Sequence, residues 1–151
     1  MFGIPRAPLL LGLAGLLPFM LGALISTLAD IAPSADSYPI IIANDGIKIL
    51  VLYGTIILSF MSGVLWGFAT KAEGAKATTG YILSVMPTLW AFFMRGGKPV
   101  ETLPYLIAGF LGLLVLDYFF NREGLTPPWW MPLRILLTSI VVICLGIGAF
   151  A

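Results

Sequence analysis

Residues Tyr53–Gly67 read YGTIILSFMSGVLWG, a stretch without a single charge that nevertheless contains two serines, a threonine and three glycines. A continuous apolar run without period-2 alternation predicts a membrane-spanning helix rather than a strand of a membrane barrel. Helices in a bilayer gain little by burying leucine against leucine, so they associate through small residues that let their backbones approach. The stretch therefore predicts a helix that is closely packed within a membrane bundle.

The composition of the whole chain also indicates an integral membrane protein. Of its 151 residues, 60% are hydrophobic and 10% are charged, and the mean hydropathy is +1.04. Soluble domains contain about 25% charged residues. The net charge of +1 gives no overall field that would attract nucleic acid.

The side chains that bind metals and form disulfides are scarce. The chain has no histidine, and Cys144 is its one cysteine. This composition excludes an internal disulfide, a Cys/His zinc site and bis-histidine haem ligation. We therefore predict no cofactor and no metal site, and we expect Cys144, which lies in an apolar run, to be inert packing.

The charged residues divide the chain into uncharged windows that predict an all-α polytopic membrane protein, with residues 1–151 as a single transmembrane domain. A membrane helix needs about 20 mainly apolar residues. Five windows approach or exceed this length, and they predict transmembrane helices near 8–29, 49–70, 78–94, 102–120 and 133–150. The first is longer than the apolar region of a signal peptide, so we expect a permanent helix. Pro18 and Pro87 are expected to kink their helices, either shaping the packing or opening a cavity for a lipid or quinone.

The distribution of Lys and Arg predicts the orientation, because cytoplasmic segments are enriched in these residues. With the N-terminus inside, the inner segments contain Arg6, Lys71, Lys76, Arg122 and Arg134, and the outer segments contain Lys48, Arg95 and Lys98. This bias predicts a bacterial inner-membrane protein with a cytoplasmic N-terminus and an external C-terminus. In a mitochondrion the matrix would replace the cytoplasm.

Small residues recur every four positions in the second and third predicted helices. Residues four apart lie on one face of a helix. The two predicted ridges are Thr55, Ser59, Gly63 and Gly67 in the second helix, and Gly80, Ser84 and Thr88 in the third. A short loop makes these helices antiparallel neighbours, so we predict that the ridges face each other. The alternative is a polar path through the bundle for an ion or small solute, although such paths usually contain an ionisable group at mid-membrane depth.

Polar residues gather where the fourth predicted helix ends and the fifth begins. Asp117 is followed by a loop with two prolines, then by Trp129 and Trp130, which suit a membrane interface, and then by Arg134. Asp117 and Arg134 would lie on the same side of the membrane at similar depth. An ion pair there would reduce the cost of placing either charge near hydrocarbon. Alternatively, each would reach lipid headgroups or water alone. Thr138, one turn after Arg134, could extend this polar patch.

Several of these segments together resemble a known family. The resemblance rests on LGLAGLLPFMLGA, YGTIILSFMSGVLWG and SVMPTLWA in the first three predicted helices, on Asp117, and on PPWWMPLRILLT entering the fifth. The sequence resembles the small multi-span membrane family of unknown function that includes the mitochondrial transmembrane protein sixty-nine and many proteobacterial proteins. Trp130 departs from that family's pattern, which often has tyrosine there. The resemblance implies an inner membrane of bacteria or mitochondria and names no catalytic residue.

Three classes of function remain open at this stage. The first is a non-catalytic accessory or assembly factor that packs against a larger membrane complex, and we predict this class. The second is a small transporter or channel, acting as a homo-oligomer. The third is an interfacial enzyme that binds a lipid or quinone, for which the candidate groups are Asp117, Arg134, Tyr118 and Asp45. No nucleophile–base pair or phosphate-binding loop supports an enzyme.

Overall fold

The computed structural model describes residues 3–31 and 43–150, and all regular structure in them is helical. The helices are α1 (Arg6–Ala14), α2 (Leu17–Ile31), α3 (Ala43–Ala69), α4 (Gly74–Phe93), α5 (Pro99–Arg122) and α6 (Trp130–Phe150). Together α1 and α2 form the first predicted span, and each later helix matches one predicted span. The helical segments begin two to six residues before the predicted spans, because the predicted spans are bounded by charged residues whereas α3 and α4 begin before Lys48 and Lys76.

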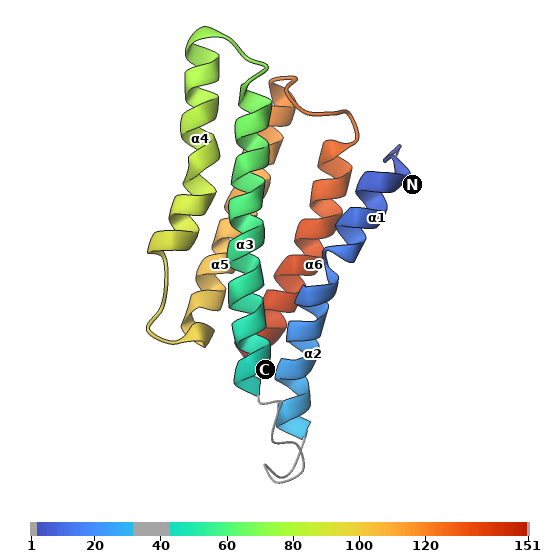
Figure 1. Cartoon of the computed structure of the whole chain (residues 1–151), viewed down its shortest axis with the longest axis vertical. Coiled ribbons are helices and arrows are strands. Elements are labelled where there is room, and N and C mark those ends of the chain that lie inside the picture. The colour runs from blue at the N-terminus through green and yellow to red at the C-terminus, as the bar shows by residue number, and fades with distance from the viewer. Residues whose placement is uncertain (1–2, 32–42, 151) are drawn as a thin grey trace.

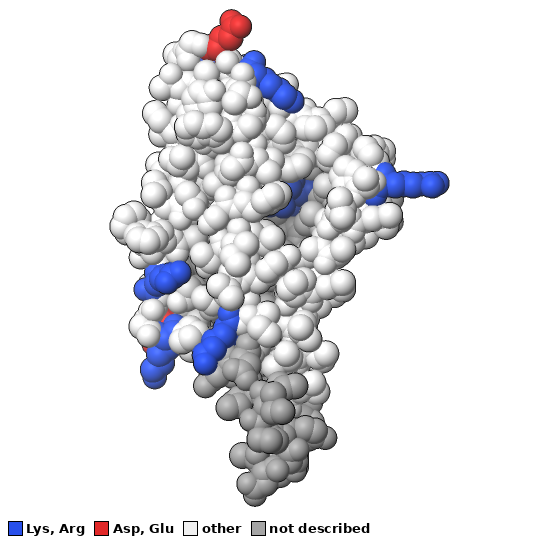
Figure 2. All heavy atoms as spheres, in the orientation of Figure 1, with Lys and Arg blue, Asp and Glu red and all other residues white. Residues whose placement is uncertain are grey.

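The six helices form one bundle with α3 at its centre. Figure 1 shows α3 between α4 and the α1–α2 pair, with α5 and α6 behind it, and α3 contacts each of α2, α4, α5 and α6. Leu50, Leu58 and Leu65 of α3 are completely buried. In Figure 2, charged atoms on the visible face gather near the top and at the lower left, one basic side chain projects on the right, further blue atoms lie inside a hollow, and the surface between them is uncharged. The fold is that of a polytopic membrane protein.

Four segments of the described chain are long and apolar enough to cross a membrane: Arg6–Leu28, Gly46–Ala69, Pro99–Arg122 and Trp130–Phe150. The remaining predicted span, the third along the chain, is α4; it has sufficient length but is less apolar, because it begins with a polar stretch that includes Lys76 and two threonines. It packs beside both α3 and α5. We therefore expect α4 to cross the same thickness as these two neighbours.

The two prolines that were expected to kink their helices differ in outcome. The first span breaks between Ala14 and Leu17, and Pro18 follows this break. A proline clashes with the carbonyl four residues earlier, which here belongs to Ala14, the last residue of α1. In contrast, α4 continues through Pro87. The backbone N–H of Thr88 there donates to Ser62 Oγ of α3 at 2.9 Å, so a neighbouring helix satisfies a donor next to the proline.

The prediction that the two ridges of small residues face each other is correct for α4 and wrong for half of α3. Gly80 and Ser84 are buried, and Thr88 Oγ1 donates to Ser59 Oγ at 3.1 Å. By contrast, Gly63 and Gly67 are exposed, and a Cβ added to either would meet nothing within 4 Å.

The error comes from helical geometry. Four residues turn an α-helix through slightly more than one full revolution, so a row of four such residues drifts by about 120° around its axis. The part of α3 that packs on α4 instead follows mixed three- and four-residue steps. It includes Ser59, Ser62 and Ala69, and Ala69 approaches Gly80 so closely that a Cβ on Gly80 would lie 3.0 Å from it.

The close crossing of α2 and α3 was not predicted. A Cβ on Gly46 of α3 would lie 2.6 Å from both the carbonyl oxygen of Gly22 and the backbone nitrogen of Ser26 in α2. The sequence signal was present, because Gly22 and Ser26 are small residues four apart. The predicted span 49–70 begins after the charged Lys48, so Gly46 lies outside it and Gly22 and Ser26 have no predicted neighbour.

This crossing predicts that Gly46→Ala destabilises the protein. The added methyl group meets backbone atoms that cannot rotate away, so we expect a loss of about 2–3 kcal/mol, the upper range of typical overpacking costs. The matched control is Gly63→Ala, which lies on an open surface of the helix and should not destabilise; it should stabilise by up to about 1 kcal/mol, because alanine is the better helix former. The measurement is thermal unfolding in a mild detergent. Equal losses from both substitutions would contradict the assignment of the crossing.

Candidate functional site

A tight turn between α5 and α6 brings the predicted polar residues together. Gly124 has φ +73°, and its N–H donates to the carbonyl of Asn121 at 3.1 Å, while the N–H of Leu125 donates to that of Phe120 at 3.1 Å. These bonds form a Schellman motif, which requires a left-handed residue and therefore favours glycine. Pro127 and Pro128 then precede α6. The short turn places the first two turns of α6 beside the last two turns of α5.

Asp117 and Arg134 form a buried ion pair, one of the two alternatives that the sequence left open. The Asp117 side chain is completely buried, and Arg134 is 5% exposed. Arg134 Nε donates to Asp117 Oδ2 at 2.9 Å. A charge removed from water is costly unless it is paired and hydrogen-bonded, so each residue here makes the burial of the other tolerable.

Trp130 is a third member of this cluster. Its Nε1 donates to the second carboxylate oxygen, Asp117 Oδ1, at 3.0 Å. Its ring packs edge-on against Phe68 of α3, with 5.0 Å between the ring centroids. The cluster Asp117–Trp130–Arg134 therefore joins α5 to α6, and the tryptophan ring attaches both helices to α3.

The remaining candidates occupy different surroundings. Thr138 is 2% exposed and lies one turn beyond Arg134 on α6. Trp129 is half-buried in the turn, next to the Trp130 ring, so it suits the interfacial position predicted for it. Tyr118 is 57% exposed, whereas Asp117 beside it is buried, so the two side chains do not form a common site. Cys144 is buried among apolar residues, as expected. The side chain of Asp45 lies outside the described residues.

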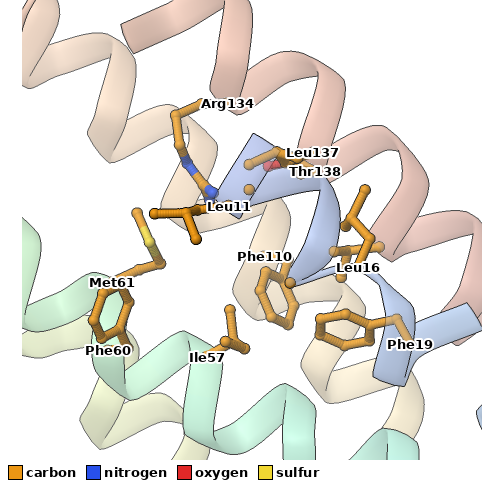
Figure 3. Close-up of a pocket in the computed structure, with 13 residues that line it drawn as sticks. Leu11, Leu16, Phe19, Ile57, Phe60, Met61, Phe110, Arg134, Leu137 and Thr138 are labelled. Atoms are coloured by element: carbon orange, nitrogen blue, oxygen red, sulfur yellow. The ribbon is translucent and has the colours of Figure 1, made fainter. Parts of the chain in front are cut away.

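An apolar cavity of about 270 Å³ adjoins the ion pair (Figure 3). Its walls come from α1, α2, α3, α5 and α6, and its polar lining residues are Arg134 and Thr138. Within residues 3–31 and 43–150, neither Arg134 Nη2 nor Thr138 Oγ1 has a hydrogen-bond partner. An unsatisfied buried donor costs about 1–3 kcal/mol, so these two atoms need explanation. The same described residues contain no group of three His, Cys, Asp or Glu side chains placed to bind a metal.

A second, exposed ion pair lies near the site. Lys76 Nζ approaches Glu123 Oε2 at 2.9 Å and also donates to the Glu123 carbonyl at 3.2 Å. It links the start of α4 to the α5–α6 turn, so both lie at the same end of the bundle. An exposed pair of this kind contributes at most about 1 kcal/mol.

Comparison with known proteins identifies the family. The family described as "Protein of unknown function (DUF3429)" matches residues 4–150. The chain belongs to this family. It is also 32% identical, over 146 residues, to "Transmembrane protein 69" of Xenopus tropicalis. This confirms the resemblance inferred from the sequence motifs and supports a membrane location.

The alignment with the Xenopus protein covers 93% of this chain and 53% of the relative. The chain thus spans about half the length of this relative. No solved structure matches.

The buried pair predicts strong thermodynamic coupling. Asp117→Asn and Arg134→Gln should each cost about 3–5 kcal/mol, because each leaves its former partner as an unpaired buried charge. The double substitution leaves no unpaired charge and should cost clearly less than the sum. The measurement is thermal unfolding of all four proteins in the same detergent. Additivity within about 0.5 kcal/mol would show that the two residues act independently.

Proposed function

We propose that this protein is a non-catalytic accessory or assembly factor that packs against a larger complex in the inner membrane. The observation that carries the proposal is the outward position of Gly63 and Gly67 on α3, which we call the α3 glycine face. Two glycines four residues apart in an apolar helix are the usual contact motif between membrane helices. In this protein no other helix of the described chain occupies that face.

The cost of these glycines supports an external partner. Each glycine inside a helix is less favourable than alanine by about 1 kcal/mol. Internal packing offsets this cost at Gly46 and Gly80, where a neighbouring helix fills the space. At Gly63 and Gly67 the bundle provides no such compensation. A helix of another membrane protein could approach the backbone of α3 closely at these two glycines, and the resulting packing would offset their cost.

The shape of the surrounding surface is consistent with a docking helix. Phe60 and Trp66, both substantially exposed, lie near the two glycines along α3. The backbone of a partner helix could contact the α3 glycine face directly, and the side chains of Phe60 and Trp66 would pack against its flanks. The described site contributes no nucleophile or metal cluster that would favour the enzyme alternative over this one.

The partner prediction is tested by purifying the tagged protein from its native membrane in a mild detergent. The wild type should bring a stoichiometric membrane partner, and Gly63→Leu/Gly67→Leu should lose it while keeping its own thermal stability. The control is Gly146→Leu on α6, since Gly146 is also open but has no second glycine four residues away. Retention of the partner by the double variant would contradict the proposal. Recovery of a homo-oligomer alone would instead favour the transporter or channel alternative.

We also propose that the N-terminus faces the cytoplasm, or the matrix in a mitochondrion. Arg134 is buried in its ion pair, so the exposed basic residues are Arg6, Lys71, Lys76 and Arg122 at one end and Lys48, Arg95 and Lys98 at the other. Four exposed basic residues at the inner end against three at the outer end favour the same orientation as the count from the sequence. Reporter fusions after Gly74 should therefore be cytoplasmic, and fusions to the C-terminus external. A cytoplasmic C-terminus would contradict this orientation.

A further inference from the structure

We propose that the cavity beside the ion pair binds the carbonyl end of a neutral, apolar membrane molecule. In this arrangement Arg134 Nη2 and Thr138 Oγ1 donate hydrogen bonds to carbonyl oxygen, and the apolar body lies against the cavity walls. This is a ligand site of the chain itself, and it goes beyond the proposed docking function. It does not depend on any partner protein.

The two unpartnered donors point to an acceptor. Arg134 and Thr138 are both more than nine-tenths buried, and they lie one turn apart on the side of α6 that lines the cavity. Figure 3 shows the Arg134 side chain reaching toward the cavity from α6, with Thr138 further along the same helix. The guanidinium uses Nε for Asp117 and leaves Nη2 without a partner among the described residues. An oxygen that accepts from these groups would remove the cost of burying them unsatisfied.

The charge balance favours a neutral acceptor. Asp117 already neutralises Arg134 at 2.9 Å, and Trp130 occupies the other carboxylate oxygen. A carboxylate or phosphate in the cavity would add an uncompensated negative charge close to Asp117. Burying such a charge in an apolar environment is costly. A ketone, quinone or ester carbonyl accepts the same hydrogen bonds without adding charge.

The walls favour an apolar body over a cluster of water. Apart from Arg134 and Thr138, the lining consists of aliphatic and aromatic side chains and two glycines. A buried water needs two to four polar partners, and these two donors cannot supply them for more than one or two molecules. Phe19, Phe110 and Met61 instead offer surfaces for a ring or an acyl chain.

The cavity is also open to the lipid. Leu11 of α1 and Phe60 of α3 line it, and they are 74% and 64% exposed. Its volume of about 270 Å³ lies near the lower limit of ligand pockets, which typically hold roughly 300–1,000 Å³. The cavity therefore fits a head group or ring, while a longer tail would leave between α1 and α3 into the bilayer.

The test is native mass spectrometry of the full-length protein, purified and delipidated in detergent and then titrated with three probes. The probes are a decyl-substituted benzoquinone, dioleoylglycerol as a neutral ester, and oleate at pH 8 as an anion. We expect one neutral probe to bind at one molecule per chain, more tightly than oleate. Binding of the quinone alone identifies a quinone site, and binding of the diester alone identifies an acyl-lipid site. Tighter binding of oleate, or no saturable binding of any probe, would overturn the proposal.

Thr138→Val separates a ligand contact from a structural role. Valine keeps the shape of threonine but removes the hydroxyl, so affinity for the neutral probe should fall about 5- to 10-fold, the loss of roughly one hydrogen bond. The melting temperature without probe should not fall, because the substitution removes a buried polar group without a partner. The control is Ser139→Ala, whose hydroxyl is exposed and donates to the Ile135 carbonyl. Equal affinity of both variants would overturn the assignment of Thr138.

A second variant keeps the proposal testable if Thr138→Val does not fold. Leu11→Trp changes an exposed residue at the cavity mouth, so the bundle should tolerate it. The larger ring should obstruct entry and weaken binding of the neutral probe at least 10-fold. Unchanged binding by the folded Leu11→Trp protein would place the bound molecule elsewhere and overturn the proposal.

Discussion

A carboxylate with no exposure to solvent, inside a membrane helix, constrains the rest of this bundle. Asp117 can be ionised there only if a cation and hydrogen-bond donors satisfy both of its oxygens. Arg134 and Trp130 meet this requirement from one face of α6. The turn at Gly124 must therefore be short, and α6 must have one rotation and one height relative to α5. The Trp130 ring extends this constraint to α3 through Phe68.

The sequence predicted the fold class, the five helical segments, four of them apolar enough to cross a membrane, and the proximity of Asp117 to Arg134, because charge spacing and chain order determine these features. It did not predict helix rotation. Four-residue spacing alone predicts an interior position for the α3 glycine face, but such a row drifts around the helix, and the drift carries both glycines to the surface. The aromatic pair Trp129–Trp130 predicts an interfacial position and no contact between Trp130 and Asp117, whereas the structure shows a hydrogen bond between them. Yet Trp130, Arg134 and Thr138 are each four residues apart, and that spacing could have identified Trp130 as a partner of the pair.

The guanidinium of Arg134 connects structure with the proposed ligand site. Its Nε is used within the bundle, while Nη2 lies beside the cavity with Thr138. Arginine can donate to Asp117 and into the cavity at the same time, because it presents several donors on one rigid plane. A lysine has a single ammonium group and could not reach both places. The same neutralised charge explains why the cavity suits a carbonyl rather than an anion. Packing at Gly46 holds α2 against α3, two of the helices that line the cavity, whereas Gly63 and Gly67 remain available to a partner.

The most direct test of the central claim is solution NMR of the detergent-solubilised protein with ¹⁵N-labelled arginine and tryptophan. The account predicts that the Arg134 Hε and Trp130 Hε1 protons exchange slowly with water, and that Asp117→Asn shifts both resonances. Neither effect should appear at Arg6 or Trp129, which make no contact with this carboxylate. Rapid exchange at Arg134 Hε, or a resonance that does not respond to Asp117→Asn, would contradict the claim that this buried cluster joins α5 to α6.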